Sequence, residues 1–364
     1  MLARRPLGSL DLPMVLAIAA LVGLGMLAIA SATVDQPGRE GLWQRQLMWL
    51  VVGAALGTVV FLVDYHFWAE FSLVLHGGVV LLLLVVLFLG TEVGGNRSWL
   101  VLGPVRLQPS ELAKWTTCLV LASYLTNRVR GSMGLRQMIA MGMLVGAPVV
   151  LIALQPDLGS ALIFVPIYLA ALLLGGLRWR VITSLCVAGL LLAPVAWMQL
   201  EDYQRERILT VFDETRDPSG VGYQVRQSKI AIGSGELTGK GLFHGTQSRL
   251  NFLPAQHTDF VLAVLAEELG FMGAVAVLGL FYYMIFRAIV AGRSSQDRLG
   301  TYICLLVAAW ITGQMAINVG MVLGLLPTIG VPLPFISYGG SALVAAACGV
   351  ALILNVRGRR FVNA

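Results

Sequence analysis

Residues 72–90 read SLVLHGGVVLLLLVVLFLG, a stretch of 19 residues without one Asp, Glu, Lys or Arg. Roughly twenty helical residues cross a hydrocarbon layer about 30 Å thick, so this stretch predicts a transmembrane helix. Similar apolar runs recur along the 364-residue chain, which is 57% hydrophobic and 12% charged. An ordinary soluble domain carries roughly 25% charged residues. The sequence therefore predicts an all-α polytopic membrane protein.

About ten segments qualify as membrane spans, and together they predict a single transmembrane domain over residues 1–364. The first span follows Arg4 and Arg5 and ends in small residues, which also fits a cleaved signal peptide. It is longer than the roughly 7 to 15 apolar residues of a signal peptide, which favours a retained helix. The expected spans are 13–32, 47–63, 72–90, 109–126, 138–154, 156–177, 181–199, 260–286, 299–325 and 341–355.

The arginines predict the orientation of the chain in the membrane. With ten spans, both termini lie on one side. The short segments of that side hold Arg4, Arg5, Arg128, Arg130, Arg136, Arg178, Arg180, Arg287, Arg293, Arg298, Arg357, Arg359 and Arg360. The opposite short loops hold only Arg39, Arg45, Arg97 and Arg106. The positive-inside rule places both termini in the cytoplasm, and residues 200–259, too long to obey the rule, form one large extracytoplasmic segment.

Composition also argues against two other classes of protein. The net charge of +6 does not indicate nucleic-acid binding, because the arginines lie singly or in threes between apolar runs. The cysteines lie inside apolar segments without C-x-x-C spacing, so neither disulfides nor a zinc site is expected. These cysteines are Cys118, Cys186, Cys304 and Cys348.

Ionisable residues inside predicted spans are candidates for function. Each costs about 2.5 to 3.5 kcal/mol at a helix centre, so it needs a partner or a watery cavity. Glu111 and Lys114 share a helix face and can form an ion pair, which either neutralises itself or serves chemistry. Asp157 follows Pro156 at the start of a span, where a carboxylate either caps the helix or orients a cation in a cavity.

Residues 326–341, LPTIGVPLPFISYGGS, contain three prolines and three glycines. Such a segment cannot form a regular helix, because proline lacks a backbone donor. Within lipid, irregular backbone is tolerated only against protein or around a wet cavity. A plain connecting loop is the alternative, but it would not need to be so apolar. We expect residues 326–340 to form a re-entrant loop on the outer side.

Asp259 lies at the outer mouth of the span that begins near residue 260. Its carboxylate could carry out chemistry, although local sequence alone favours the simpler interpretation that Thr258 or Asp259 caps that helix. Glu267 and Glu268 lie two turns deeper, about 12 Å at 1.5 Å per residue. At least one of these two glutamates should face the interior of the bundle.

At these residues the chain closely resembles the SEDS family of shape, elongation, division and sporulation proteins. The similarity covers nearly the whole chain, and residues 227–235 with 245–248 resemble the elongation branch of the family rather than the division branch. The motifs that carry the resemblance are LQPSELAK at 107–114, QPDLG at 155–159, QSKIAIGSG at 227–235, HTDF at 257–260 and the stretch ending in SYGGS at 337–341.

The resemblance implies a peptidoglycan glycosyltransferase that polymerises lipid II during cell elongation. It also implies a class B penicillin-binding protein and the elongation machinery as partners. An essential acidic residue is implied within residues 254–259, where Asp259 is the one carboxylate present, and this favours chemistry over capping. Family members usually carry an acidic residue where this chain has Ala255. If that position carries the chemistry, the chain is inactive as written.

The implied reaction needs a base for the acceptor hydroxyl and positive charge for the leaving pyrophosphate. Asp259 is the expected base, with position 255 as the alternative. A divalent cation would also serve the pyrophosphate, although no ligand motif is present. A lipid II flippase and a non-catalytic scaffold for the penicillin-binding protein are the rival functions. The expected substrate-binding residues are Lys114, Glu111, Asp157, Lys229, Arg226, Lys240, His257, Ser337 and Tyr338.

Overall fold

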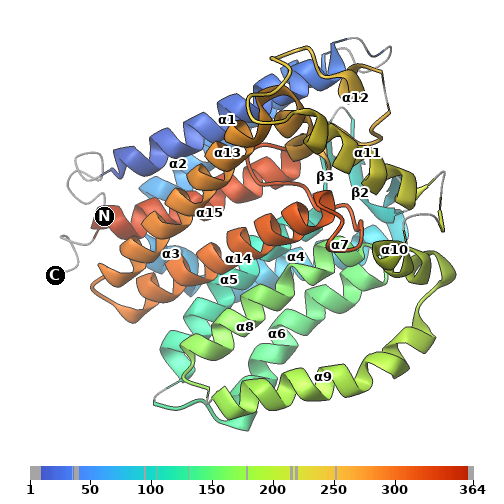
Figure 1. The fold of residues 1–364 in the computed structure, drawn as a ribbon. Helices are drawn as coiled ribbons and strands as arrows, with labels where there is room; N and C mark the ends of the chain where they lie inside the picture. Colours follow the sequence, from blue (N-terminus) through green and yellow to red (C-terminus); the bar gives the residue numbers. More distant parts are fainter. Residues whose placement is uncertain are drawn as a thin grey trace.

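A computed structural model describes residues 10–34, 36, 41–93, 96–103, 105–129, 131–177, 179–213, 216–217, 220–250 and 252–359. It confirms a mostly helical polytopic membrane protein whose long helices run side by side (Figure 1). Among the described residues, seven helices are long and apolar enough to cross a membrane. They are α1 (Leu12–Thr33), α2 (Leu42–Leu62), α4 (Ser72–Leu89), α6 (Leu135–Ala153), α13 (Val261–Arg293), α14 (Arg298–Val322) and α15 (Gly340–Arg359).

The other expected spans are also helical, with one difference. The span predicted at 156–177 is broken at Ile163 into two helices. Pro166 explains the break, because in one continuous helix its ring would clash with the carbonyl of Leu162. These spans are α5 (Pro109–Arg128), α7 (Leu158–Leu162) with α8 (Phe164–Leu174), and α9 (Trp179–Gln199), which lies at the edge of the bundle in Figure 1.

Residues 91–107 form a small sheet that the all-α prediction missed. Strands β1 (Thr91–Val93), β2 (Asn96–Leu102) and β3 (Val105–Leu107) pair antiparallel in the order β1-β2-β3. The register sets Glu92 opposite Arg97 and Val101 opposite Arg106. Strands this short carry too few residues for a period of two to stand out in the sequence.

Both ends of the described chain lie at the same end of the bundle. Asp11, which caps α1, accepts hydrogen bonds from Arg287 at the end of α13, and it lies 2.9 Å from Arg357 of α15. We call this the arginine-rich end, because Arg287, Arg293, Arg298, Arg357 and Arg359 gather there. At the opposite end lie the sheet and the shorter helices α10 (Asp202–Phe212), α11 (Val221–Ser234) and α12 (Thr246–Arg249) (Figure 1).

Helix α13 is kinked at Gly270, whose φ is 69°. The kink frees backbone groups that a straight helix would pair internally, and residues 236–241 pair with them instead. The amides of Phe271 and Met272 donate to the carbonyls of Glu236 and Leu237. The amides of Lys240 and Gly241 donate in turn to the carbonyls of Glu267 and Glu268. Residues 236–241 thereby complete the hydrogen bonding of α13 at the kink.

Candidate functional site

Asp259 lies in a tight turn just before α13, at the end of the bundle opposite the arginine-rich end. The amides of Thr258 and Asp259 both donate to the carbonyl of Ala255, at 3.1 and 3.0 Å. Helix α13 begins at Val261 with Phe260 as its N-cap, and no side chain makes a capping hydrogen bond there. The alternative that Thr258 or Asp259 caps α13 is therefore wrong. The half-buried carboxylate of Asp259 has no capping role.

The proline-rich segment, residues 326–340, packs beside this turn. The amide of Tyr338 donates to the carbonyl of His257 at 2.8 Å, and the two rings lie 5.7 Å apart. The hydroxyl of Ser337 accepts from the amide of Leu333 and so closes a local turn. At Gly330, whose φ is 69°, a Cβ atom would lie 3.4 Å from Oδ2 of Asp259. The segment forms one wall of the space next to the carboxylate.

Helix α7 lies against the same segment, and Asp157 caps it. Asp157 accepts hydrogen bonds from the amide of Ser160 at 3.1 Å and from the side chain of Gln108 at 3.0 Å. The capping alternative for Asp157 is thus confirmed. A Cβ atom at Gly159 would lie 2.2 Å from the carbonyl oxygen of Ile329. Only glycine lets α7 and the proline-rich segment approach this closely.

Gly159→Ala is expected to push the proline-rich segment away from Asp259 and to lower activity by on the order of tenfold or more, since misplacement by 1 Å can cost about 10²-fold. Gly146→Ala in α6 is the matched control, because a Cβ atom there would meet nothing within 4 Å. Both variants should elute from gel filtration like the parent chain. Equal activity of the two variants in a polymerisation assay would show that this contact does not matter.

The environment of Asp259 raises the pKa of its carboxyl from 3.8 to about 6. Burial is the largest cause, because it disfavours the charged form. A hydrogen bond with Thr258 and the positive charge of Arg207 lower the pKa in part, whereas the negative charge of Asp157 raises it further. A carboxyl with a pKa near 6 is mostly ionised at neutral pH yet takes up a proton more readily than an ordinary aspartate, which suits a group that accepts a proton.

The expected ion pair between Glu111 and Lys114 is present and almost completely buried. Nζ of Lys114 lies 2.6 Å from Glu111 and 3.4 Å from the side-chain oxygen of Gln314, and it faces the ring of Trp310. Oε2 of Glu111 has no hydrogen-bond partner among the described residues. Gln314 also donates to the carbonyl of Pro332 at 2.8 Å. The pair is thereby connected to the proline-rich segment through one side chain.

The other expected cations lie at different places around the site. Lys240 forms an ion pair with Glu267 at 2.7 Å and a hydrogen bond with Thr246. Lys229 of α11 packs against Gly324 at the end of α14, and Arg226 lies half-buried on the same face of α11. The structure therefore joins Lys240 to the kink of α13 and sets Lys229 beside the end of α14.

Both glutamates of α13 are completely buried, which confirms that at least one faces the interior. Glu267 accepts from the amides of Gln247 and Ser248, and Glu268 accepts from the hydroxyl of Ser31. Within the described part of the chain, no group of three or more His, Cys, Asp or Glu side chains gathers that could hold a metal ion.

Sequence reasoning missed several residues next to Asp259. Arg207 belongs to the charged run 201–207, which gives no sign that one member faces the site. Asn318, which donates to the carbonyl of Asp259, looks in the sequence like a polar residue within a span. The signal available in the sequence was the position of this polar side chain inside an apolar span, since a polar group there needs a partner.

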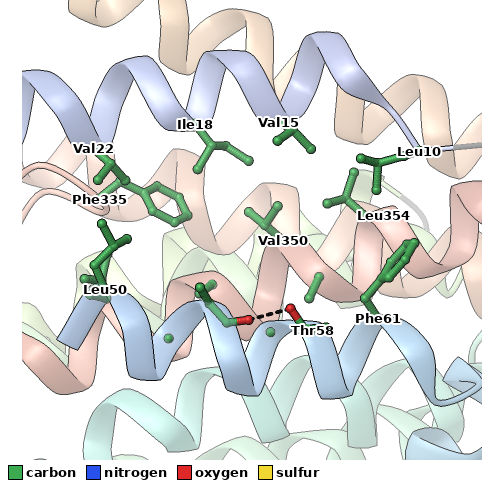
Figure 2. Close-up of a pocket in the computed structure, with 16 residues that line it drawn as sticks. Leu10, Val15, Ile18, Val22, Leu50, Thr58, Phe61, Phe335, Val350 and Leu354 are labelled. Atoms are coloured by element: carbon green, nitrogen blue, oxygen red, sulfur yellow. Dashed lines mark hydrogen bonds between the residues drawn. The ribbon is translucent and has the colours of Figure 1, made fainter. Parts of the chain in front are cut away.

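An apolar cavity of about 330 Å³ lies between α1, α2 and α15. Figure 2 shows Val15, Ile18 and Val22 of α1 facing Leu50 and Phe61 of α2 across it, with Phe335 of the proline-rich segment at one end. Gly53 and Gly57 widen it on the α2 side. The hydroxyl of Thr58 donates to the carbonyl of Ala54 within α2, so it offers the cavity little polarity (Figure 2). The lining suits hydrocarbon, not sugar or phosphate.

The fold and the site define a multi-pass membrane protein with a half-buried, uncapped carboxylate of raised pKa at one end. The profile of the FtsW/RodA/SpoVE family of cell cycle proteins matches residues 12–360. The chain belongs to this family, which is the SEDS family.

Individual relatives agree over nearly the full length. The chain is 38% identical to the peptidoglycan glycosyltransferase MrdB of Escherichia coli K12, over 96% of this chain and 94% of MrdB. It is also 38% identical to a probable peptidoglycan glycosyltransferase FtsW of Nitrosococcus halophilus, over 95% and 92% of the two chains.

Two solved structures share the fold. The first is a chain of a peptidoglycan synthase complex that coordinates polymerization and crosslinking. Its TM-score is 0.83, its identity is 32%, and the match covers 97% of this chain and 98% of that chain. The second is the rod shape determining protein RodA of Thermus thermophilus, with a TM-score of 0.72, 30% identity and the same coverage.

Proposed function

We propose that this protein is a peptidoglycan glycosyltransferase that polymerises lipid II into glycan strands during cell elongation. Relatives of near-equal length carry the name of that activity. The observation that carries the proposal is the carboxylate of Asp259. It lies uncapped beside the proline-rich segment, and its pKa of about 6 suits a base near neutral pH.

The reaction joins the 4-hydroxyl of an acceptor sugar to the anomeric carbon of a donor sugar. Asp259 accepts the hydroxyl proton while the new C–O bond forms and the bond to the polyprenyl pyrophosphate breaks. The electron pair of the broken bond leaves with the pyrophosphate. General-base catalysis of this kind contributes typically about 10²- to 10⁴-fold in rate.

The leaving pyrophosphate needs fixed positive charge. Arg207 is the cation whose charge acts on Asp259, and Lys229 and Arg226 of α11 lie on the same end of the bundle. An arginine grips phosphate oxygens in a fork, whereas a lysine acts as a point charge. Arg207 therefore joins the candidate phosphate-binding residues, ahead of Lys240, whose charge is matched by Glu267.

The apolar cavity of Figure 2 bears on how the substrate is arranged. Sugar and pyrophosphate cannot leave water for such a lining without losing their hydrogen bonds. His257, Ser337 and Asp259 are not among the residues that line the cavity, so the polar reaction belongs outside it, beside Asp259. A substrate with a polar head and a long hydrocarbon chain suits this neighbourhood.

Polymerisation should fall with pH below about 6. Because the pKa of Asp259 is raised, its carboxylate is the dominant form above about 6 and is lost as the pH falls through that value. Well below it, kcat/KM should drop tenfold per pH unit. Initial rates between pH 4.5 and 8.5 check this. A profile that stays flat down to pH 4.5 would contradict a base with this pKa.

The direct test is polymerisation of purified lipid II by the detergent-solubilised chain, alone and with a class B penicillin-binding protein. Glycan strands support the proposal. Flipping of lipid II in liposomes without polymer would favour the transporter instead, and indifference to changes at Asp259 would favour the scaffold. If the chain makes no polymer but Ala255→Asp or Ala255→Glu restores it, the base belongs at position 255 and not at Asp259.

Partner and orientation are part of the same proposal. The chain lies in a bacterial cytoplasmic membrane with both termini in the cytoplasm and the Asp259 end outside. The arginines gathered beside α1 and α15 support this orientation through the positive-inside rule. The likeness to a chain from a peptidoglycan synthase complex supports a crosslinking partner.

A further inference from the structure

Asn318 of α14 connects the turn that carries Asp259 to the proline-rich segment. Its side chain is completely buried. The amide nitrogen donates to the carbonyl of Asp259 at 2.9 Å and to the carbonyl of Val331 at 2.7 Å. Each of the two hydrogens of the amide group therefore bonds to one wall of the site, one to the turn of Asp259 and the other to the proline-rich segment. Asn318 thus bonds to both walls at once.

The proline-rich segment needs donors from outside itself. Pro332 and Pro334 have no backbone N–H, so residues 331–334 cannot complete their own ladder of hydrogen bonds. Within a membrane each carbonyl must find a donor in the protein. Helix α14 supplies two, from Gln314 to Pro332 and from Asn318 to Val331. These two side chains are four residues apart and lie on one helix face.

We infer that Asn318 is a positioning residue for the reaction, an inference that rests on the proposed function. Its bond to Val331 fixes the neighbouring Gly330 against the carboxylate of Asp259, and its second bond fixes the backbone of Asp259 itself. Together these bonds set how the carboxylate points and how far it is sheltered from water. Asn318 touches neither sugar nor proton.

Two charged groups from other elements and one hydrogen bond from its own turn act on Asp259. Asp157 acts from the start of α7, Arg207 acts from α10, and Thr258 acts from the same turn. Burial is nevertheless the largest influence on the carboxyl. Loss of the Asn318 bonds should admit water and return the pKa of Asp259 towards its ordinary value of 3.8. This response separates a positioning role from a purely structural one.

The test uses the full-length chain in detergent with lipid II. Asn318→Leu keeps the size of the side chain and removes both donors, and Asn318→Ala leaves room for water to donate in their place. We expect kcat to fall by on the order of 10²-fold with KM changed less than about twofold. The acid limb of the pH–rate profile should move to lower pH in whichever variant folds.

Thr312→Ala is the matched control on the same helix, because among the described residues this exposed threonine bonds only to Ala308 of its own helix. It should keep the parent kcat and the parent acid limb. Folding of each variant is followed by gel filtration and thermal unfolding. The inference is overturned if a folded Asn318 variant keeps the parent kcat, or loses kcat while its acid limb stays in place.

The two proposals fail in different ways. An active parent chain with an inactive Asp259→Asn variant establishes the proposed function regardless of what the Asn318 variants do. A parent chain that makes no polymer, and in which neither Ala255→Asp nor Ala255→Glu restores it, overturns the proposed function, and the inference about Asn318 falls with it.

Discussion

Asp259→Asn should reduce polymerisation of lipid II by about 10²- to 10⁴-fold while the protein stays folded. Asparagine has nearly the same shape as aspartate, so the turn from Ala255 to Phe260 and the two bonds from Asn318 can persist. What disappears is the one group that can accept the proton of the acceptor hydroxyl. Because ionised Asp259 is disfavoured in the folded protein, Asp259→Asn should unfold no more easily than the parent above pH 6.

The measurement is the yield of glycan strands from purified lipid II when the purified variant is the one enzyme added. Asp202→Asn is the matched control, because Asp202 is a fully exposed carboxylate on α10 at the same end of the bundle. It should polymerise at the parent rate. Near-normal polymer from Asp259→Asn would remove Asp259 from the role of base, and position 255 would then be tested next.

Lys114→Met should destabilise the protein by about 3 to 5 kcal/mol, because it leaves the carboxylate of Glu111 buried without its partner. Glu111 already has one oxygen without a hydrogen-bond partner among the described residues, so nothing nearby can take over from Lys114. The hydrogen bond from Lys114 to Gln314 would also be lost, and with it part of the support of Pro332. Unfolding in a denaturing detergent series measures the change.

The double variant Glu111→Gln with Lys114→Met separates the two alternatives for this pair. It removes both charges together and should recover most of the lost stability. Recovered stability with recovered polymerisation would identify the pair as structural. Recovered stability without polymerisation would assign the pair a part in the reaction. A Lys114→Met variant as stable as the parent would contradict a stabilising role for the pair.

Much of the fold could be predicted because membrane spans depend on local composition. The apolar run at 72–90 corresponds to α4 within one residue at its end. The spans at 13–32 and 138–154 differ from α1 and α6 by three residues or fewer at either end. The sheet between residues 91 and 107 could not be predicted, since it depends on tertiary packing. The break at Ile163 was missed although Pro166, which explains it, is visible in the sequence.

The candidate site was predictable only in part. A carboxylate within or beside a span stands out against apolar neighbours, so Asp157, Asp259 and the pair of Glu111 and Lys114 could be found from the sequence. Their surroundings could not, because Arg207 and Asn318 approach Asp259 from distant parts of the chain. Local sequence also favoured capping for Asp259, whereas the main-chain turn through Ala255 starts the helix without it.

The kink at Gly270 has a consequence for how the chain can evolve. Residues 236–241 act as a surrogate turn of α13, inserted from elsewhere in the sequence to take up the donors and acceptors that the kink exposes. Loops elsewhere tolerate insertion and deletion, because their main chain can turn to water. Residues 236–241 should not tolerate insertion or deletion in this way, because their peptide groups pair with α13. Losing even one of these residues would leave peptide groups of α13 at the kink without hydrogen-bond partners.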